Sequence, residues 1–118
     1  MSSAALAETP RGVLAAWETN SQVYFARIGF IISDLVKPIG APGVGVRRKH
    51  PAVAGNAAGE TILAWTEGMG WNRGGSVVWQ VFDQHGEPTQ DKGRADGVPT
   101  WSLVSAFARP DGGFTVIY

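Results

Sequence analysis

The hydrophobic positions of this chain fall into short runs that are rich in Val, Ile, Trp, Tyr and Phe. Turn residues separate the runs, and no window of about a dozen residues free of Gly and Pro carries the i, i+3, i+4 spacing of an amphipathic helix. Short apolar runs bounded by turn residues are typical of β-strands. The pattern predicts strands at Ala4–Ala7, Val13–Glu18, Gln22–Ile28, Ala52–Gly55, Thr61–Glu67, Ser76–Asp83, Leu103–Arg109 and Phe114–Tyr118, with weaker outer strands within Ile31–Ile39 and Gln90–Gly97.

One hairpin pattern occurs three times along the chain. Pro51–Glu67 (PAVAGNAAGETILAWTE), Ser3–Glu18 and Ser105–Tyr118 each join two apolar runs through a polar turn that contains Gly, and the second run ends on an aromatic residue. The next strand repeats as well, because Gln22–Ile28 (QVYFARI) matches Ser76–Phe82 (SVVWQVF). A unit that recurs after about 50 residues in a chain of short strands predicts stacked β-modules, and propeller blades are the leading interpretation.

The repeat divides a single domain, residues 1–118, into blades. We expect an all-β protein in which each β-propeller blade is a four-stranded antiparallel sheet. Blade 1 covers about residues 2–48, blade 2 about residues 49–100, and a half-blade of two strands residues 101–118. The alternative is a sandwich of two sheets, but sandwich strands need not resemble one another at a fixed period.

The aromatic residues of the repeat are expected in the wide space between blades, whereas the small residues of each first strand suit the crowded axis of a propeller. The aromatic set assigned to this core is Trp17, Phe25, Trp65, Trp79, Phe82 and Tyr118.

The repeat P-x-V-A-x-x-x-x-G-x-x-x-x-A-W-T-E, followed by G-x-V-x-x-Q-x-F-D-x-x-G-x-P, resembles blades of the sialidase-like (BNR-type) β-propellers. It stands here as Pro51–Glu67 and Gly75–Pro88, and it covers one blade well and the other partially. The resemblance implies a propeller fold; sialidases of this kind use an arginine triad, a tyrosine nucleophile and an acid/base aspartate. The family's Asp-box, S-x-D-x-G-x-T-W, is absent and no arginine matches the triad by local motif, so the resemblance implies the fold and assigns no catalytic residue.

Composition narrows the classes of partner. Ten basic and ten acidic side chains cancel, and the longest run of one sign is Arg47–Lys49, which argues against nucleic-acid binding. The chain has no cysteine, and its apolar runs are too short to span a membrane. The N-terminal residues lack the basic and apolar regions of a signal peptide, so we expect either a cytoplasmic protein or a piece of a longer exported one.

Two and a half blades are too few to close a ring, because propellers have about four to eight. Exposed strand edges and aromatic faces promote aggregation unless they are covered. We therefore expect a homo-oligomer, a dimer or trimer that completes a propeller, or a fragment of a larger ring.

The loops that would open on the axial face carry the candidate binding residues. The long loop Gly68–Gly75 contains Trp71, Asn72 and Arg73, a set suited to stacking on a sugar ring and bonding its hydroxyls or carboxylate. The alternative is that Trp71 folds back to cap its blade.

The loop before the second blade adds Arg47, Arg48, Lys49 and His50, which could bind an acidic ligand through charged hydrogen bonds. A solvated basic run, or an inter-subunit salt bridge with Glu18 or Glu67, is the more conservative interpretation.

Three further residues complete the predicted mouth. Trp101 occupies the matching position before the half-blade, and Glu18 and Glu67 end their strands at similar places. Paired carboxylates are the minimum for glycoside hydrolysis, but these two recur because the blade recurs, which favours a structural role. No metal site or cofactor is expected.

The sequence favours a non-catalytic β-propeller module that assembles with itself into a closed ring, with a carbohydrate or another small polar ligand at the axial mouth. A sialidase-like glycoside hydrolase, or a fragment of one, is the second hypothesis. A purely structural propeller fragment is the third.

Overall fold

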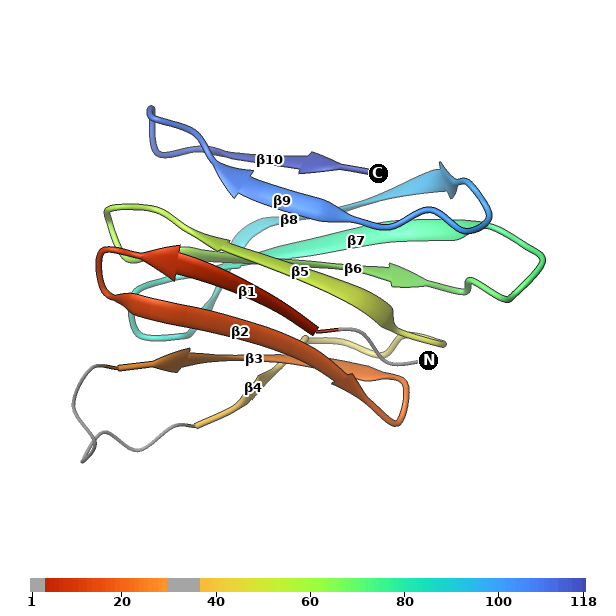
Figure 1. The fold of residues 1–118 in the computed structure, drawn as a ribbon, viewed down its shortest axis with the longest axis horizontal. Coiled ribbons are helices and arrows are strands. Elements are labelled where there is room, and N and C mark those ends of the chain that lie inside the picture. The colour runs from red at the N-terminus through yellow and green to blue at the C-terminus, as the bar shows by residue number, and fades with distance from the viewer. Residues whose placement is uncertain (1–3, 30–36) are drawn as a thin grey trace.

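The computed structural model describes residues 4–29 and 37–118, and these residues form three antiparallel sheets and no helix (Figure 1). Sheet I consists of β1 (Ala4–Thr9), β2 (Gly12–Thr19), β3 (Gln22–Ile28) and β4 (Ile39–Gly40), in that order. Sheet II consists of β5 (Lys49–Gly55), β6 (Thr61–Glu67), β7 (Gly75–Phe82) and β8 (Pro88–Val98), also in chain order. Sheet III is the hairpin of β9 (Ser105–Ala108) and β10 (Phe114–Ile117).

The predicted strands are confirmed wherever the chain is described, and the all-β prediction with them. Two outer strands differ from expectation. β8 is longer than the predicted Gln90–Gly97, because it pairs along most of β7. Most of the predicted Ile31–Ile39 strand lies outside the described residues, and the described part of sheet I ends in the two-residue β4. The described residues form three sheets, so the two-sheet sandwich is not the arrangement.

Tight turns join the paired strands, as the sequence predicts. Gly59 has φ +88° in the turn between β5 and β6, and Gly112 has φ +89° in the turn between β9 and β10. Only glycine adopts this backbone conformation without a steric penalty. Asn56 strengthens the first turn, since its Oδ1 accepts the Glu60 N–H at 3.0 Å. These turns fix the register of the two hairpins.

The three sheets stack in chain order, with sheet II in the middle (Figure 1). We call the side of a sheet that is turned toward the following sheet its front face, and the other side its back face. The front face of sheet I packs on the back face of sheet II, where Phe25 and Phe82 have ring centroids 4.7 Å apart. This core contains Leu14, Ala16, Val23, Phe25, Ala41, Val53, Leu63, Trp65 and Phe82. The front face of sheet II packs on the back face of sheet III through Ala52, Ala54, Ile62, Ala64, Val77, Val81, Ala106, Phe114 and Val116.

The second and third strands pair in the same alignment in sheet I as in sheet II. Trp17 of β2 pairs with Tyr24 of β3, and Trp65 of β6 pairs with Val78 of β7, so the two tryptophans occupy equivalent positions. Both lie on back faces, but only sheet II has a described neighbour there. Trp65 is therefore 1 % exposed, whereas Trp17 stacks on Tyr24 at a partly exposed surface.

Within the chain, the aromatic prediction is confirmed for four residues, while Trp17 and Tyr118 lie at partly exposed surfaces. Phe25, Trp65 and Phe82 are buried between sheets I and II, and Trp79 is partly buried between sheets II and III. Trp17 has no described sheet against its face. Tyr118, which follows the last strand, is 47 % exposed.

The first strands of the three sheets lie next to one another. β1 contacts β5, and β5 contacts β9, while β5 also reaches β2 and β3 (Figure 1). The contacts between different sheets therefore concentrate on the first strands, in particular on β5.

Candidate functional site

Four chain segments come together at one end of the molecule, which we call the loop end. They are the turn between β2 and β3, the loop between β6 and β7, and the loops that precede β5 and β9, all on the right in Figure 1. Antiparallel strands alternate in direction, so every second connection lies at the same end. The sequence predicts this grouping, and the topology confirms it.

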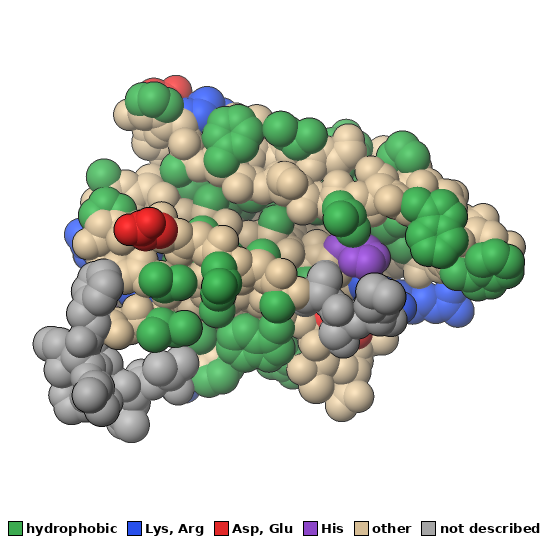
Figure 2. All heavy atoms as spheres, viewed as in Figure 1, with side chains coloured by type: hydrophobic (Ala, Val, Ile, Leu, Met, Phe, Trp, Pro, Cys, Tyr) green, Lys and Arg blue, Asp and Glu red, His purple; other side chains and the backbone are tan. Residues whose placement is uncertain are grey.

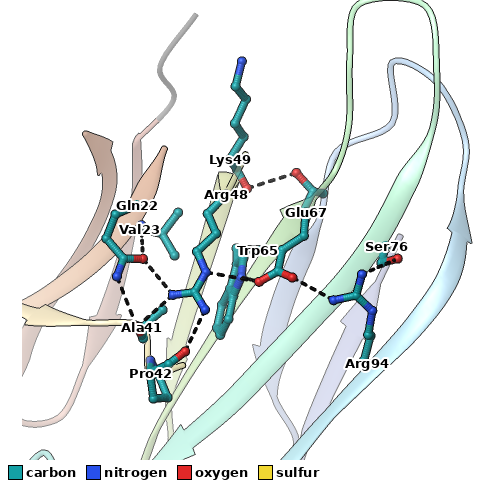
Figure 3. Close-up of polar contacts among 11 residues, drawn as sticks. Gln22, Val23, Ala41, Pro42, Arg48, Lys49, Trp65, Glu67, Ser76 and Arg94 are labelled. Atoms are coloured by element: carbon teal, nitrogen blue, oxygen red, sulfur yellow. Dashed lines mark hydrogen bonds and ion pairs between the residues drawn. The ribbon is translucent and has the colours of Figure 1, made fainter. Parts of the chain in front are cut away.

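A buried ion-pair network lies at the loop end, between sheets I and II (Figure 3). Arg48 is 4 % exposed, and its Nε lies 3.1 Å from Oε2 of Glu67. The same Oε2 accepts the Trp65 indole N–H at 2.9 Å, and the Arg48 guanidinium lies over the Trp65 ring at 5.3 Å from its centroid. On the other side of the carboxylate, Nη1 of Arg94 lies 2.7 Å from Oε1.

The remaining donors of Arg48 hold the loop before β5. Its Nη1 donates to Gln22 Oε1 at 2.9 Å and to the Ala41 carbonyl at 2.8 Å, and its Nη2 donates to the Pro42 carbonyl at 2.7 Å (Figure 3). One guanidinium thus joins sheet I, the loop and the carboxylate of sheet II. Arg48 is placed as a structural anchor, with its polar atoms satisfied inside the chain.

The ionisation of Glu67 fits this role. Burial opposes the charged form, but the hydrogen bonds from Trp65 and Arg94 and the charges of Arg48 and Arg94 outweigh it, so the pKa of Glu67 lies below its ordinary value. Glu67 is therefore a charged partner of the network at neutral pH.

Glu18 and Glu67 are not equivalent, contrary to the sequence prediction. Glu18 follows Trp17 directly, whereas Glu67 follows Trp65 by two residues, with Thr66 between. Because side chains alternate across a strand, one extra residue moves the second carboxylate to the opposite face of its sheet. Glu18 accepts the Ser21 N–H at 3.1 Å in the β2–β3 turn.

A separate pocket of about 310 Å³ opens at the loop end. Trp71 and Trp101 both line it, and they are 77 % and 76 % exposed. Met69 and Leu103 add apolar surface, and His50 adds an imidazole. Figure 2 shows hydrophobic, histidine and basic side chains together at this end of the molecule.

The backbone presents both tryptophans outward. Gly70 and Arg73 exchange two backbone hydrogen bonds, of 3.3 and 3.4 Å, which places Trp71 at the tip of a small hairpin. Trp101 lies in a turn closed by the bond from Ser102 N–H to the Pro99 carbonyl, and its φ is +68°. That conformation favours glycine, so a large exposed side chain is held there at a cost in backbone strain.

His50 is presented by an irregular backbone as well. It lies where the pairing of β5 with β6 shifts between Lys49 and Ala52, and its φ is +52°. Bulges of this kind redirect side chains. Burial, followed by the positive charge of Lys49, lowers the pKa of His50, and its Nδ1 is buried without a hydrogen-bond partner in the described part of the chain.

Three further predicted site residues, Arg47, Asn72 and Arg73, lie at or beside the Trp71 hairpin and do not line the pocket. A Cβ built on Gly70 would lie 3.7 Å from Nη1 of Arg47 and 3.8 Å from Cγ of Arg73, so both arginines border the Trp71 hairpin. Arg73 Nε donates to the Gly68 carbonyl at 3.1 Å. Asn72 is exposed and is not among the residues that line the pocket.

The structure therefore brings Trp71, Trp101 and His50 together and places Arg48 and Glu67 in the internal network. Lys49, which belongs to the predicted basic loop, lines the pocket too, whereas sequence reasoning missed Met69, Gly70, Ser102 and Leu103 in its wall. Each of them lies within two residues of a predicted site residue, so sequence proximity was the available signal.

Two further features, a metal site and a membrane-spanning helix, are absent from the described residues. No group of three His, Asp or Glu side chains in residues 4–29 and 37–118 could hold a metal ion, and the two histidines line different pockets. Within the same ranges there is no helix of the length and hydropathy needed to cross a bilayer.

No family model, curated protein or solved structure matches this chain. The class that the fold defines is an all-β protein of stacked antiparallel sheets. The resemblance to sialidase-like blades stays a prediction that rests on the repeat.

Proposed function

We propose that the chain is a non-catalytic β-propeller module that assembles head to tail with further copies of itself into a closed ring. In this proposal sheets I and II are complete blades and sheet III is a half-blade. The observation that supports it is that equivalent faces are used twice. The face of sheet I that carries Leu14 and Phe25 packs on sheet II, and the matching face of sheet II, which carries Ile62 and Trp79, packs on sheet III, with the first strands side by side.

The outer faces of sheets I and III carry exposed apolar side chains. A second copy of the chain, stacked as the sheets stack within one chain, would cover them. Leu6 on the back face of sheet I is 75 % exposed, although Val53, its equivalent in sheet II, is 5 % exposed. On the front face of sheet III, Phe107 is 47 % and Ile117 is 56 % exposed. Figure 2 shows hydrophobic side chains on the surface over β1 and β2 and, across the view, over β9 and β10.

These two faces suit each other. Within the chain, the front face of each sheet covers the back face of the next, so the front face of sheet III in one copy fits the back face of sheet I in another. Such a contact uses two different patches and is heterologous, and a heterologous contact closes a ring when its rotation allows. Two or three copies are the expected number.

The test blocks each face separately. Leu6→Asp places a charge on the back face, and Phe107→Asp places one on the front face; both positions are exposed, so the monomer should fold in each case. We expect wild type to be an oligomer by light scattering, and each variant alone to be a monomer. An equal mixture should form a 1:1 dimer, because one intact front face meets one intact back face.

Other outcomes contradict the proposal. If Leu6→Asp dissociates the protein but Phe107→Asp does not, the contact is a symmetric one through sheet I. If wild type is a monomer, the module does not assemble with itself.

A further inference from the structure

We propose that the pocket between Trp71 and Trp101 binds a pyranose ring of an acidic saccharide. The carboxylate of a uronic acid would contact the basic rim, by which we mean Lys49, Arg47 and Arg73. All the residues concerned belong to one chain, so the site does not depend on the proposed assembly.

The aromatic walls supply the first argument. Two tryptophans from different loops line one pocket while about three-quarters of each side chain is exposed, and the exposed Leu103 extends the apolar surface over the buried Met69. Exposed apolar surface of this kind marks a binding site rather than a core. The electron-rich face of an indole attracts the partly positive C–H groups on the apolar side of a pyranose. A volume of about 310 Å³ lies at the small end of ligand sites, which suits one sugar ring.

The backbone supplies the second argument. His50 and Trp101 both line the pocket, and both have positive φ where the fold would more easily accept glycine. Strain of this kind persists where the surrounding structure maintains it, and it concentrates at binding sites.

Charge supplies the third argument and selects an acidic ligand. Lys49 lines the pocket, and Arg47 and Arg73 border the Trp71 hairpin. The ion pairs between described residues use Arg48, Arg94 and Arg109 and none of these three cations. Lys49 in the pocket wall, with Arg47 and Arg73 beside the neighbouring hairpin, favours a carboxylate on the sugar through charge-assisted hydrogen bonds. The carboxylate of Glu18 is the acidic group whose charge acts on His50 from the other side.

The binding experiment compares uronate oligosaccharides with their neutral counterparts. Trigalacturonate, a tri-glucuronate and the matching neutral trisaccharides are titrated into the full chain by calorimetry and by tryptophan fluorescence. We expect the uronates to bind at least about tenfold more tightly than the neutral sugars, and the difference to shrink as salt rises. Trp71→Ala and Trp101→Ala should each weaken binding by about tenfold or more, while Trp71→Phe should keep most of it.

Two matched lysine variants test whether uronate binding depends on a charge in the pocket or only on the net charge of the protein. Lys49→Ala should weaken uronate binding several-fold and leave neutral sugars unaffected, whereas Lys92→Ala, on β8 and not among the pocket residues, should change neither. Uronates that do not bind at millimolar concentration, or binding that survives both tryptophan-to-alanine changes, would overturn the proposal. Equal binding of neutral sugars would overturn its acidic part.

The same variants distinguish this site from the ring interface. Phe107→Asp, which should be a monomer and lies outside the pocket, should still bind the uronates. Trp71→Ala should assemble to the same mass as wild type. If Trp71→Ala dissociates the assembly, the tryptophans belong to an interface between copies and the saccharide site is wrong.

Discussion

Replacing Glu67 by alanine should destabilise the fold strongly, because it would leave the charge of Arg48 buried among neutral acceptors. Arg48 is 4 % exposed, and its Nε lies 3.1 Å from the Glu67 carboxylate. Removing one partner of a buried ion pair costs about 3–5 kcal/mol. The indole N–H of Trp65 would lose its acceptor as well. We expect Glu67→Ala to lower the free energy of unfolding by about 3–5 kcal/mol, a large part of the stability of a small domain.

The assay is urea unfolding at pH 7 followed by circular dichroism, with Arg94→Ala as the control. Arg94 also bonds to the Glu67 carboxylate, at 2.7 Å, but its side chain is 54 % exposed. Water and salt screen such a pair, so its removal should cost at most about 1 kcal/mol. If Glu67→Ala costs no more than Arg94→Ala, the reasoning about the buried network is refuted.

Three further predictions concern the same fold. Because folding lowers the pKa of Glu67, its ionised carboxylate stabilises the fold above about pH 4.5, and this contribution is lost as pH falls through the folded-state pKa. The free energy of unfolding should therefore fall more steeply with decreasing pH in wild type than in Glu67→Gln. Gly45→Ala should cost about 1–3 kcal/mol in thermal unfolding, since its Cβ would overlap the Glu67 carboxylate, whereas Gly40→Ala would make only ordinary contacts, of 3.5 Å or more, and should cost less. Leu14→Ala, at a position 0 % exposed, should cost about 2–5 kcal/mol in urea unfolding, and Leu103→Ala, at 64 %, about 0.5 kcal/mol or less.

The strands were predictable because their signal is local. Alternating apolar runs and glycine-containing turns, such as Asn56–Gly59, specify hairpins without knowledge of the rest of the fold. The repeat then predicts four-stranded sheets, and sheets I and II have that number.

The internal network was less predictable because its members come from separate segments. Arg48 and Glu67 are 19 residues apart, and Arg94 is another 27 residues along the chain. The sequence of the basic run Arg47–Lys49 does not indicate that Arg48 is buried. Nor does it indicate that Lys49 lines a pocket and that Arg47 lies beside the Trp71 hairpin. That division depends on how the loop before β5 inserts between two sheets.

The Glu18 and Glu67 prediction was wrong for a related reason. The two strand ends look alike in sequence, but one intervening residue, Thr66, reverses the side on which the carboxylate lies. By contrast, Trp71 and Trp101 were predicted at one mouth from the alternation of strand direction alone, and both line the same pocket. Topology was a better guide here than residue similarity.

The mass of the protein in solution tests the central claim most directly. Light scattering across a range of concentrations should give a discrete assembly, an integer multiple of the 12.5 kDa chain, that reaches a plateau because the ring is closed. A mass of 12.5 kDa at every concentration, or one that grows without limit, would contradict the proposal that copies of this chain complete a propeller.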